Sequence, residues 1–157
     1  MNENVKAEKA PRSVRSDIYD WLQCIVMAIV ICVLFFSFIV RLVDVVGSSM
    51  YPTLENGDKI LVSNLFYTPK QGDIIVFRHG GKILVKRIVA VGGDTVSLND
   101  QDGSFAVNQE LATATRILTV PKDYFFVVGD NRQNSFDSRF WEEPFVGAKW
   151  VLARVKF

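Results

Sequence analysis

The longest hydrophobic segment of the chain lies near its N-terminus. Residues 21–40 carry no charge, and the segment is bounded by Asp20 and Arg41. A helix needs about 20 mostly apolar residues to cross the hydrocarbon core of a bilayer. The pattern therefore predicts a membrane-spanning anchor helix over residues 21–43, preceded by a polar tail over residues 1–20.

A cleaved secretory signal and a buried core helix are the alternatives for this segment. The apolar core of a secretory signal is only about 7–15 residues long, and it ends in a small-residue cleavage site. No such site follows Val40, where the chain continues with arginine and leucine. A helix that is apolar on every face is buried only inside a large protein. The membrane anchor is the favoured interpretation.

The distribution of lysine and arginine predicts the orientation of the anchor. Four such residues precede the apolar segment, at positions 6, 9, 12 and 15, whereas the nearest ones after it are Arg41 and Lys59. Cytoplasmic flanks carry the excess of lysine and arginine. The N-terminus is therefore predicted to be cytoplasmic, and residues 44–157 are predicted to form a domain on the extracytoplasmic face of the cell membrane.

From Asp44 onward the hydrophobic pattern changes to short runs that are rich in β-branched and aromatic residues. The runs cover residues 60–62, 74–77, 83–85, 88–91, 105–107, 124–128 and 150–153. Turn signals such as Asn56-Gly57-Asp58 and Gly92-Gly93-Asp94 separate them. Several short strands spaced in this way are typical of an all-β domain. The predicted fold is mainly β, with one N-terminal transmembrane helix followed by a sandwich-like or barrel-like domain.

Composition and charge narrow the possible functions of this domain. The chain has 157 residues, which is enough for one domain of ordinary size. Acidic and basic residues are equal in number from Asp44 onward, so the domain lacks the basic surface of a nucleic-acid binder. Cys24 and Cys32 both lie in the predicted anchor. The domain therefore has neither a disulfide nor a cysteine-based metal site.

The first candidate for chemistry follows the anchor, in the run Gly47-Ser48-Ser49-Met50-Tyr51-Pro52-Thr53-Leu54. A serine in such a turn is usually a loop residue that makes local hydrogen bonds. Ser49 is also a candidate nucleophile, since its distance from the anchor would hold it near the lipid surface. Gly47 permits backbone torsions that aim successive N–H groups at one point, as an oxyanion site requires.

A serine nucleophile needs a base, and the chain offers two candidates. His79 is the only histidine, but it lies in a predicted hairpin turn without a nearby acid, which disfavours a histidine triad. Lys86 is flanked by apolar residues, and desolvation there would lower its pKa and leave a neutral amine. The pair Lys86-Arg87 is equally consistent with a charged break on an edge strand.

A third polar segment follows the run at residues 124–128. The segment Gly129–Trp141 is dense in aspartate, asparagine, serine and arginine. It is consistent with a solvated loop, in which such residues make local turns. It is also consistent with an ordered network that supports a site, and this second interpretation links it to the serine and the lysine.

Together, four blocks in this order resemble the bacterial type I signal peptidases, in their compact Gram-positive-like form. The blocks are Gly47–Leu54, Gly57–Val62, Gly72–Phe77 with Val85–Val89 and Gly92–Asp94, and Gly129–Arg139. The resemblance covers nearly the whole chain. It implies a catalytic domain of coiled antiparallel sheets, which agrees with the strand pattern.

The resemblance also implies a role for individual residues. Ser49 corresponds to the nucleophile and Lys86 to the general base, while Ser135 corresponds to a serine that hydrogen-bonds the lysine amine. Three charged residues correspond to groups that stabilise the site: Arg87, Asp137 and Arg139. The oxyanion would be bound by the backbone N–H of Ser49, with a second contribution from the backbone of Gly47.

The expected substrates are exported preproteins with small residues at positions −1 and −3 of the cleavage site. Shallow apolar pockets beside the nucleophile would select them, and nearby residues in the sequence are candidates for lining them: Val43, Val45 and Met50. The resemblance implies no metal and no cofactor, and the expected partners are preproteins and membrane lipid.

Three other functions are weighed against this one. A self-cleaving repressor shares Ser-Lys chemistry on a similar β core, but it needs a DNA-binding region where this chain has its apolar segment. A membrane-tethered β module without activity would not need Ser49, Lys86 and Ser135 together. A related peptidase of an organelle membrane is scarcely distinguished by these residues.

Overall fold

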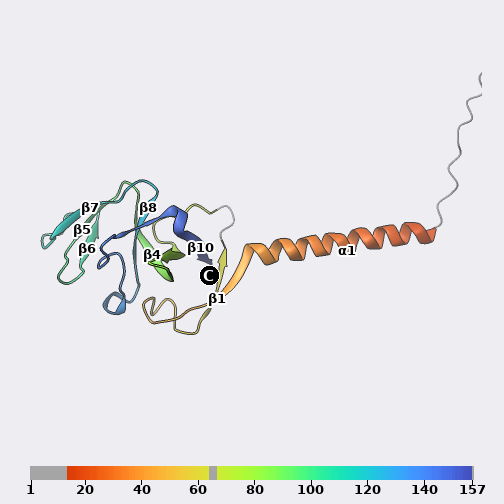
Figure 1. Ribbon diagram of the computed structural model, residues 1–157, viewed down its shortest axis with the longest axis horizontal. Coiled ribbons are helices and arrows are strands. Elements are labelled where there is room, and N and C mark those ends of the chain that lie inside the picture. Colours follow the sequence, from red (N-terminus) through yellow and green to blue (C-terminus); the bar gives the residue numbers. More distant parts are fainter. Residues whose placement is uncertain (1–13, 64–66, 157) are drawn as a thin grey trace, which may run out of the picture. The chain divides into compact units, whose positions relative to one another are not determined.

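The computed structural model describes residues 14–63 and 67–156, without the side chains of residues 14–17 and 35–41. The chain divides into two compact units, with the boundary between Phe38 and Ile39. The first unit is dominated by helix α1 (Val14–Ile39), and the second is built of β-strands (Figure 1).

Helix α1 overlaps the predicted anchor, but its bounds differ from residues 21–43. Residues Val40–Asp44 form strand β1 instead, because they pair in antiparallel register with strand β2 (Lys59–Ser63), with Val43 opposite Ile60. In the described part of the chain, no helix is both long enough and apolar enough to cross a membrane. Most of the predicted tail lies outside the described residues.

The strands of the second unit form two antiparallel sheets. In the described residues, the larger sheet has the order β1-β2-β10-β3-β4-β8-β9, and the smaller has the order β6-β5-β7. The remaining strands are β3 (Ile74–His79), β4 (Lys82–Val91), β5 (Thr95–Leu98), β6 (Phe105–Val107), β7 (Arg116–Thr119), β8 (Tyr124–Val128), β9 (Phe145–Gly147) and β10 (Val151–Lys156). Two short 3₁₀ helices, η1 (Arg132–Asn134) and η2 (Ala148–Trp150), complete the unit. The prediction of a mainly β, antiparallel fold is confirmed.

Strand β4 joins two of the predicted runs and carries the candidate base. It continues through Lys86 and Arg87 without a break, with Lys86 opposite Ile75 of β3 and Arg87 opposite Val128 of β8. Because β4 lies between β3 and β8, it is an interior strand of the sheet. The alternative interpretation, a charged break on an edge strand, is therefore wrong.

Alternation along β3 divides the interior of the large sheet into two cores. Side chains of successive strand residues point to opposite faces. Ile74 and Val76 belong to the first core, with Val45, Met50, Leu54, Ile60, Val62, Ala153 and Val155. Ile75 and Phe77 belong to the second core, with Ile88, Phe125, Val127, Trp141 and Val146. The segment before Leu54 is thus fixed to one face of the sheet, and the segment around Trp141 to the other.

Candidate active site

The loop that carries Ser49 is held by the first core on both sides of the serine. Val45 and Met50 are 5% and 2% exposed, so the chain enters and leaves the loop through buried residues. The N–H of Val45 donates to the carbonyl of Asp58, and the N–H of Leu54 donates to the carbonyl of Met50. Burial and hydrogen bonding leave the half-buried Ser49 in a fixed position.

The side chain of Lys86 meets Ser49 from the interior of the large sheet. Its Nζ lies 2.6 Å from Ser49 Oγ, within hydrogen-bond distance, and the lysine is only 4% exposed. Burial lowers the pKa of the Lys86 amine below its ordinary value, while the carboxylate of Asp137 acts in the opposite direction. A lysine of this kind has a larger neutral fraction near neutral pH, and a neutral amine can accept a proton from the serine.

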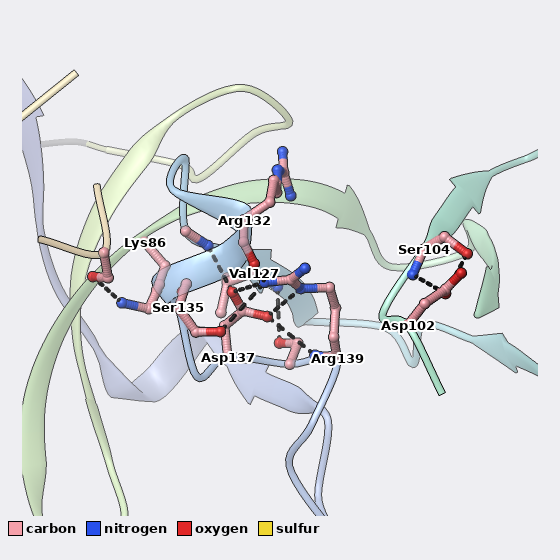
Figure 2. A network of polar contacts seen from close by, with 11 residues as sticks. Lys86, Asp102, Ser104, Val127, Arg132, Ser135, Asp137 and Arg139 are labelled. Atoms are coloured by element: carbon pink, nitrogen blue, oxygen red, sulfur yellow. Dashed lines mark hydrogen bonds and ion pairs between the residues drawn. The ribbon is translucent and has the colours of Figure 1, made fainter. Parts of the chain in front are cut away.

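The segment after β8 folds around a buried ion pair. The carboxylate of Asp137 is fully buried and accepts hydrogen bonds from Arg139, Nε to Oδ1 at 2.8 Å and Nη2 to Oδ2 at 3.0 Å. The same carboxylate accepts the N–H of Gly129 at 2.9 Å. Figure 2 shows Asp137 and Arg139 facing each other, with Ser135 and Lys86 close by and Arg132 pointing away from the pair. The network joins Arg139 to the backbone that packs against the nucleophile.

Gly129 is the point of closest approach between this segment and the nucleophile. A Cβ atom at this position would collide with Oγ of Ser135 and would lie only 2.5 Å from the carbonyl oxygen of Ser49. Only glycine leaves room for this approach. The glycine of the Gly129-Asp130-Asn131 run is therefore required by packing against Ser49 and Ser135.

Asn131 and Asp130 hold the nucleophile loop, and sequence analysis did not assign a role to either. The N–H of Asn131 donates to the carbonyl of Ser49 at 3.0 Å, and its Nδ2 donates to the carbonyl of Ser48 at 3.0 Å. The carboxylate of Asp130 accepts the hydroxyl of Thr53 at 2.6 Å. These contacts join two segments that are far apart in the sequence. Both residues lie in the Gly129–Arg139 block. Their contacts with the Ser49 loop could not be predicted from the sequence, because they depend on how distant segments pack.

Arg87 acts on the same loop through Asp130. The guanidinium makes a two-point contact with the carboxylate, Nε to Oδ1 at 2.8 Å and Nη2 to Oδ2 at 2.6 Å, and Nη1 donates to the carbonyl of Gly72. Burial disfavours the charged carboxylate, but hydrogen bonds from Arg87 and Thr53 outweigh it, so the pKa of Asp130 lies below its usual value. Arg87 is thus connected to the nucleophile loop through the carboxylate of Asp130.

The structure does not form the predicted hydrogen bond between Ser135 and the Lys86 amine. Ser135 is buried, as a supporting residue would be, but within the described residues its Oγ has no hydrogen-bond partner. The lysine amine donates its hydrogen bond to Oγ of Ser49. The hydroxyl of Ser135 faces the backbone of Gly129 instead.

Gly47 also differs from its predicted role. Its φ of +99° is the left-handed conformation that favours glycine, but its N–H donates to Oδ1 of Asn56 at 2.8 Å. That N–H is therefore not free to bind an oxyanion in this structure. In contrast, the N–H of Ser49 makes no hydrogen bond with any described residue.

The structure places His79 against Trp141, away from Ser49, and it places two of the three candidate pocket residues in the core. The ring of His79 stacks on Trp141, with 3.9 Å between ring centroids. Val45 and Met50 are buried core residues, and only Val43 of the three retains partial exposure. The structure brings Lys86, not His79, to the serine.

Comparison with known proteins gives consistent matches over most of the chain. Residues 18–117 and 100–157 match the sequence profile described as signal peptidase, peptidase S26. The chain is 35% identical to Signal peptidase I of Bacillus amyloliquefaciens over 156 residues, covering 86% of this chain and 84% of that protein. It is 34% identical to the chloroplastic Thylakoidal processing peptidase 1 of Arabidopsis thaliana over 140 residues, covering 73% of this chain and 41% of that protein. A crystal structure of a signal peptidase I from Enterococcus faecalis V583 aligns with a TM-score of 0.44 and 25% identity, covering 57% of this chain and 98% of that one.

Proposed function

The chain belongs to the peptidase S26 family of signal peptidases, and we propose that it removes N-terminal signal peptides from exported preproteins through a Ser49–Lys86 pair. The observation that carries this proposal is the 2.6 Å contact between Ser49 Oγ and Lys86 Nζ. A hydroxyl this close to a buried amine can transfer its proton directly, as an activated serine nucleophile requires.

The first half of the reaction forms an acyl-enzyme. Ser49 Oγ attacks the carbonyl carbon of the scissile peptide bond, and its proton passes to the neutral Lys86 amine. The carbon–nitrogen bond then breaks, and the lysine gives the proton to the leaving amine. The signal peptide remains as an ester on Ser49, and the mature chain leaves with a free N-terminal amine.

The second half consumes one water molecule. Lys86 accepts a proton from water as the oxygen attacks the ester carbonyl. When the ester bond breaks, the proton returns to Ser49 Oγ, and the signal peptide leaves with a free carboxylate. In both halves the developing oxyanion needs a donor, and we propose the N–H of Ser49, which makes no hydrogen bond within the described part of the chain.

The supporting roles follow from the contacts of each residue. Asp137 and Arg139 fix the backbone at Gly129, which packs against Ser49. Arg87 orients Asp130, whose carboxylate binds Thr53 of the nucleophile loop. We assign Ser135 to the surroundings of the amine, because its buried hydroxyl has no hydrogen-bond partner among residues 14–63 and 67–156 and is available to the lysine during catalysis.

We place the enzyme in the cell membrane as a single-pass protein. The uncharged residues 21–39, which lie in α1, would form the span, with the tail over 1–20 in the cytoplasm and the peptidase domain, which begins with strand β1, outside it. Ser49 lies nine residues beyond Val40, which would hold the nucleophile close to the lipid surface. A signal peptide that spans the same bilayer would present its cleavage site at this level.

We propose that the substrate carries small residues at positions −1 and −3. Val45 and Met50 are packed in the first core, so they would support the surface beside Ser49 without contacting the substrate. The half-buried Val43 is the one of the three that would contact the substrate. A rigid wall of this kind excludes large side chains because a well-packed core does not yield without cost.

The test of this function is cleavage of a preprotein by the full chain in detergent. We expect a single cut after a small residue, identified by N-terminal sequencing of the mature product, and none with Ser49→Ala. Specific DNA binding by the chain without peptide cleavage would instead favour a repressor-like function. A protein that binds preproteins but never cuts them would be a membrane-tethered module.

Activity is expected to rise with pH as the Lys86 amine loses its proton. Because burial lowers the pKa of Lys86, the neutral form appears at lower pH than for an exposed lysine. Below that pKa, kcat/KM should increase about tenfold per pH unit, and above it the profile should be flat on the alkaline side of neutral. The measurement is kcat/KM against pH with His79→Ala as the matched control. A rising limb that disappears in His79→Ala would contradict the assignment of Lys86 as the base.

A further inference from the structure

A cavity with two arginines in its lining lies between the turn before β6 and the segment after β8. It has a volume of about 590 Å³, which is within the range of ligand sites in proteins. We call it the arginine pocket. Its lining includes Gly103, Ser104, Phe105, Arg132, Arg139 and Phe140. Ser49 and Lys86 do not border it, so it is a site separate from the catalytic pair.

Each arginine of the arginine pocket is held by an aromatic ring. The guanidinium carbon of Arg132 lies 5.1 Å from the centroid of the Phe105 ring. That of Arg139 lies 4.9 Å from the centroid of the Phe140 ring. A guanidinium over an aromatic face keeps its N–H donors in a rigid plane. The pocket therefore has two cationic groups whose orientations are restricted before any ligand arrives.

The two guanidinium groups have donors that the described protein groups leave unused. Arg139 is 4% exposed, and its Nε and Nη2 donate to Asp137 and to backbone carbonyls, but its Nη1 makes no hydrogen bond with a described residue. A Cβ atom at Gly103 would collide with the Phe140 ring and would lie 3.4 Å from this Nη1, so glycine keeps that space open. The guanidinium of Arg132 forms neither a hydrogen bond nor an ion pair within residues 14–63 and 67–156.

The charges around the arginine pocket favour an anion. Asp102 is an acid of the lining, but its carboxylate accepts the N–H and the hydroxyl of Ser104, at 2.8 and 2.7 Å. Figure 2 shows Asp102 bonded to Ser104 and apart from both guanidinium groups. Desolvation and the like charge of Arg139 lower the pKa of the Arg132 guanidinium, while two carboxylates act in the opposite direction. An anion between the two arginines would offset their repulsion.

We propose that the arginine pocket binds a phosphate group, either free in solution or carried by a lipid headgroup. Guanidinium groups match the geometry of phosphate oxygens and donate charge-assisted hydrogen bonds to them. The oxygens of a phosphate are tetrahedral, so one phosphate can accept from Arg139 Nη1 and from Arg132 at the same time. A carboxylate has two oxygens in one plane, which suits a single guanidinium better. The volume of the pocket also leaves room for a group attached to the phosphate.

Binding of phosphate would stabilise the segment that packs against the nucleophile. Arg132 and Arg139 lie at the two ends of the segment that contains Asp137, and the N–H of Gly129 donates to the carboxylate of Asp137. A ligand that contacts both arginines would hold these ends together. A ligand that binds only the folded state raises the free energy of unfolding, so binding is measurable as a rise in Tm.

The experiment follows thermal unfolding of the full chain in detergent with increasing inorganic phosphate, at a pH and ionic strength held constant with chloride. For a Kd on the order of 1 mM, about 20 mM phosphate should raise the Tm by about 5 °C. Arg132→Gln should lose most of this rise, measured against its own Tm without phosphate. Arg78→Gln is the matched control, because Arg78 is an exposed arginine of β3 outside the pocket, and it should keep the full rise.

Two further additions identify the source of the phosphate. A rise in Tm with phosphatidylglycerol in the micelles, lost in Arg132→Gln and kept in Arg78→Gln, would assign the site to a lipid headgroup. A rise with inorganic phosphate alone would assign it to a soluble phosphate. Acetate that stabilises as well as phosphate would overturn the choice of phosphate over carboxylate.

The site itself is also open to refutation. No rise with either source of phosphate would overturn it, and so would an equal rise in the wild type and in Arg132→Gln. Because unfolding is the measurement, these outcomes do not depend on whether the chain cleaves a preprotein.

Discussion

Lys86→Met is expected to lower kcat/KM by at least about 10⁴-fold while leaving the fold intact. Methionine has a length similar to lysine but no group that accepts a proton, so the hydroxyl of Ser49 would lose its base. The domain should not lose stability. Burial lowers the pKa of Lys86, which means that the protonated amine is disfavoured in the folded state, and methionine removes that cost.

The pair is best tested as a double-mutant cycle. If Ser49 and Lys86 act as one unit, then Ser49→Ala alone, Lys86→Met alone and both together should reduce activity to nearly the same residual level. Losses that multiply would mean that the two residues act independently. The measurement is single-turnover cleavage of a preprotein in detergent, with thermal unfolding of each variant as the check on folding. Arg87→Met, on the neighbouring position of β4, is the matched control and should retain measurable cleavage.

Much of the catalytic arrangement was predictable because it resides in short motifs. Ser49 and Lys86 lie in runs whose order and spacing identify the family, and the structure brings the two side chains together. The apolar runs likewise predicted most of the strands, since β-branched and aromatic residues dominate them. What the runs could not predict is the order of strands in the sheet. That order makes β4 an interior strand and buries Lys86.

The features that the sequence did not predict depend either on contacts between distant segments or on which acceptor a backbone N–H takes. Strand β1 follows the helix directly and has three apolar residues, so the sequence pattern extends the anchor to residue 43, whereas pairing with β2 places these residues in the sheet. The N–H of Gly47 was expected to be free, but the amide of Asn56 takes it from the same loop. Strands β5 and β7 have four residues each, and only β5 alternates polar with apolar residues, so neither pattern is long enough to separate from loops.

Asp137→Asn is expected to lower the free energy of unfolding by about 3–5 kcal/mol. The substitution keeps the shape of the side chain but removes its charge, and Arg139, which is 4% exposed, would remain as a buried cation without a counter-ion. For a domain of this size, a loss of that magnitude corresponds to a fall in Tm of roughly 10–20 °C. Cleavage activity at lower temperature should also fall, because the hydrogen bond that fixes Gly129 against Ser49 would weaken.

Asp100→Asn provides the matched control for this prediction. Asp100 pairs with Arg116 at 2.6 Å, but both side chains are about two-fifths exposed, so the same substitution should cost less than about 1 kcal/mol. Adding Arg139→Met to Asp137→Asn should recover part of the loss, since it removes the unpaired charge. The comparison is thermal unfolding of the full chain in detergent, followed by circular dichroism. Equal shifts in Tm for Asp137→Asn and Asp100→Asn would mean that the buried pair does not hold the active-site segment in place.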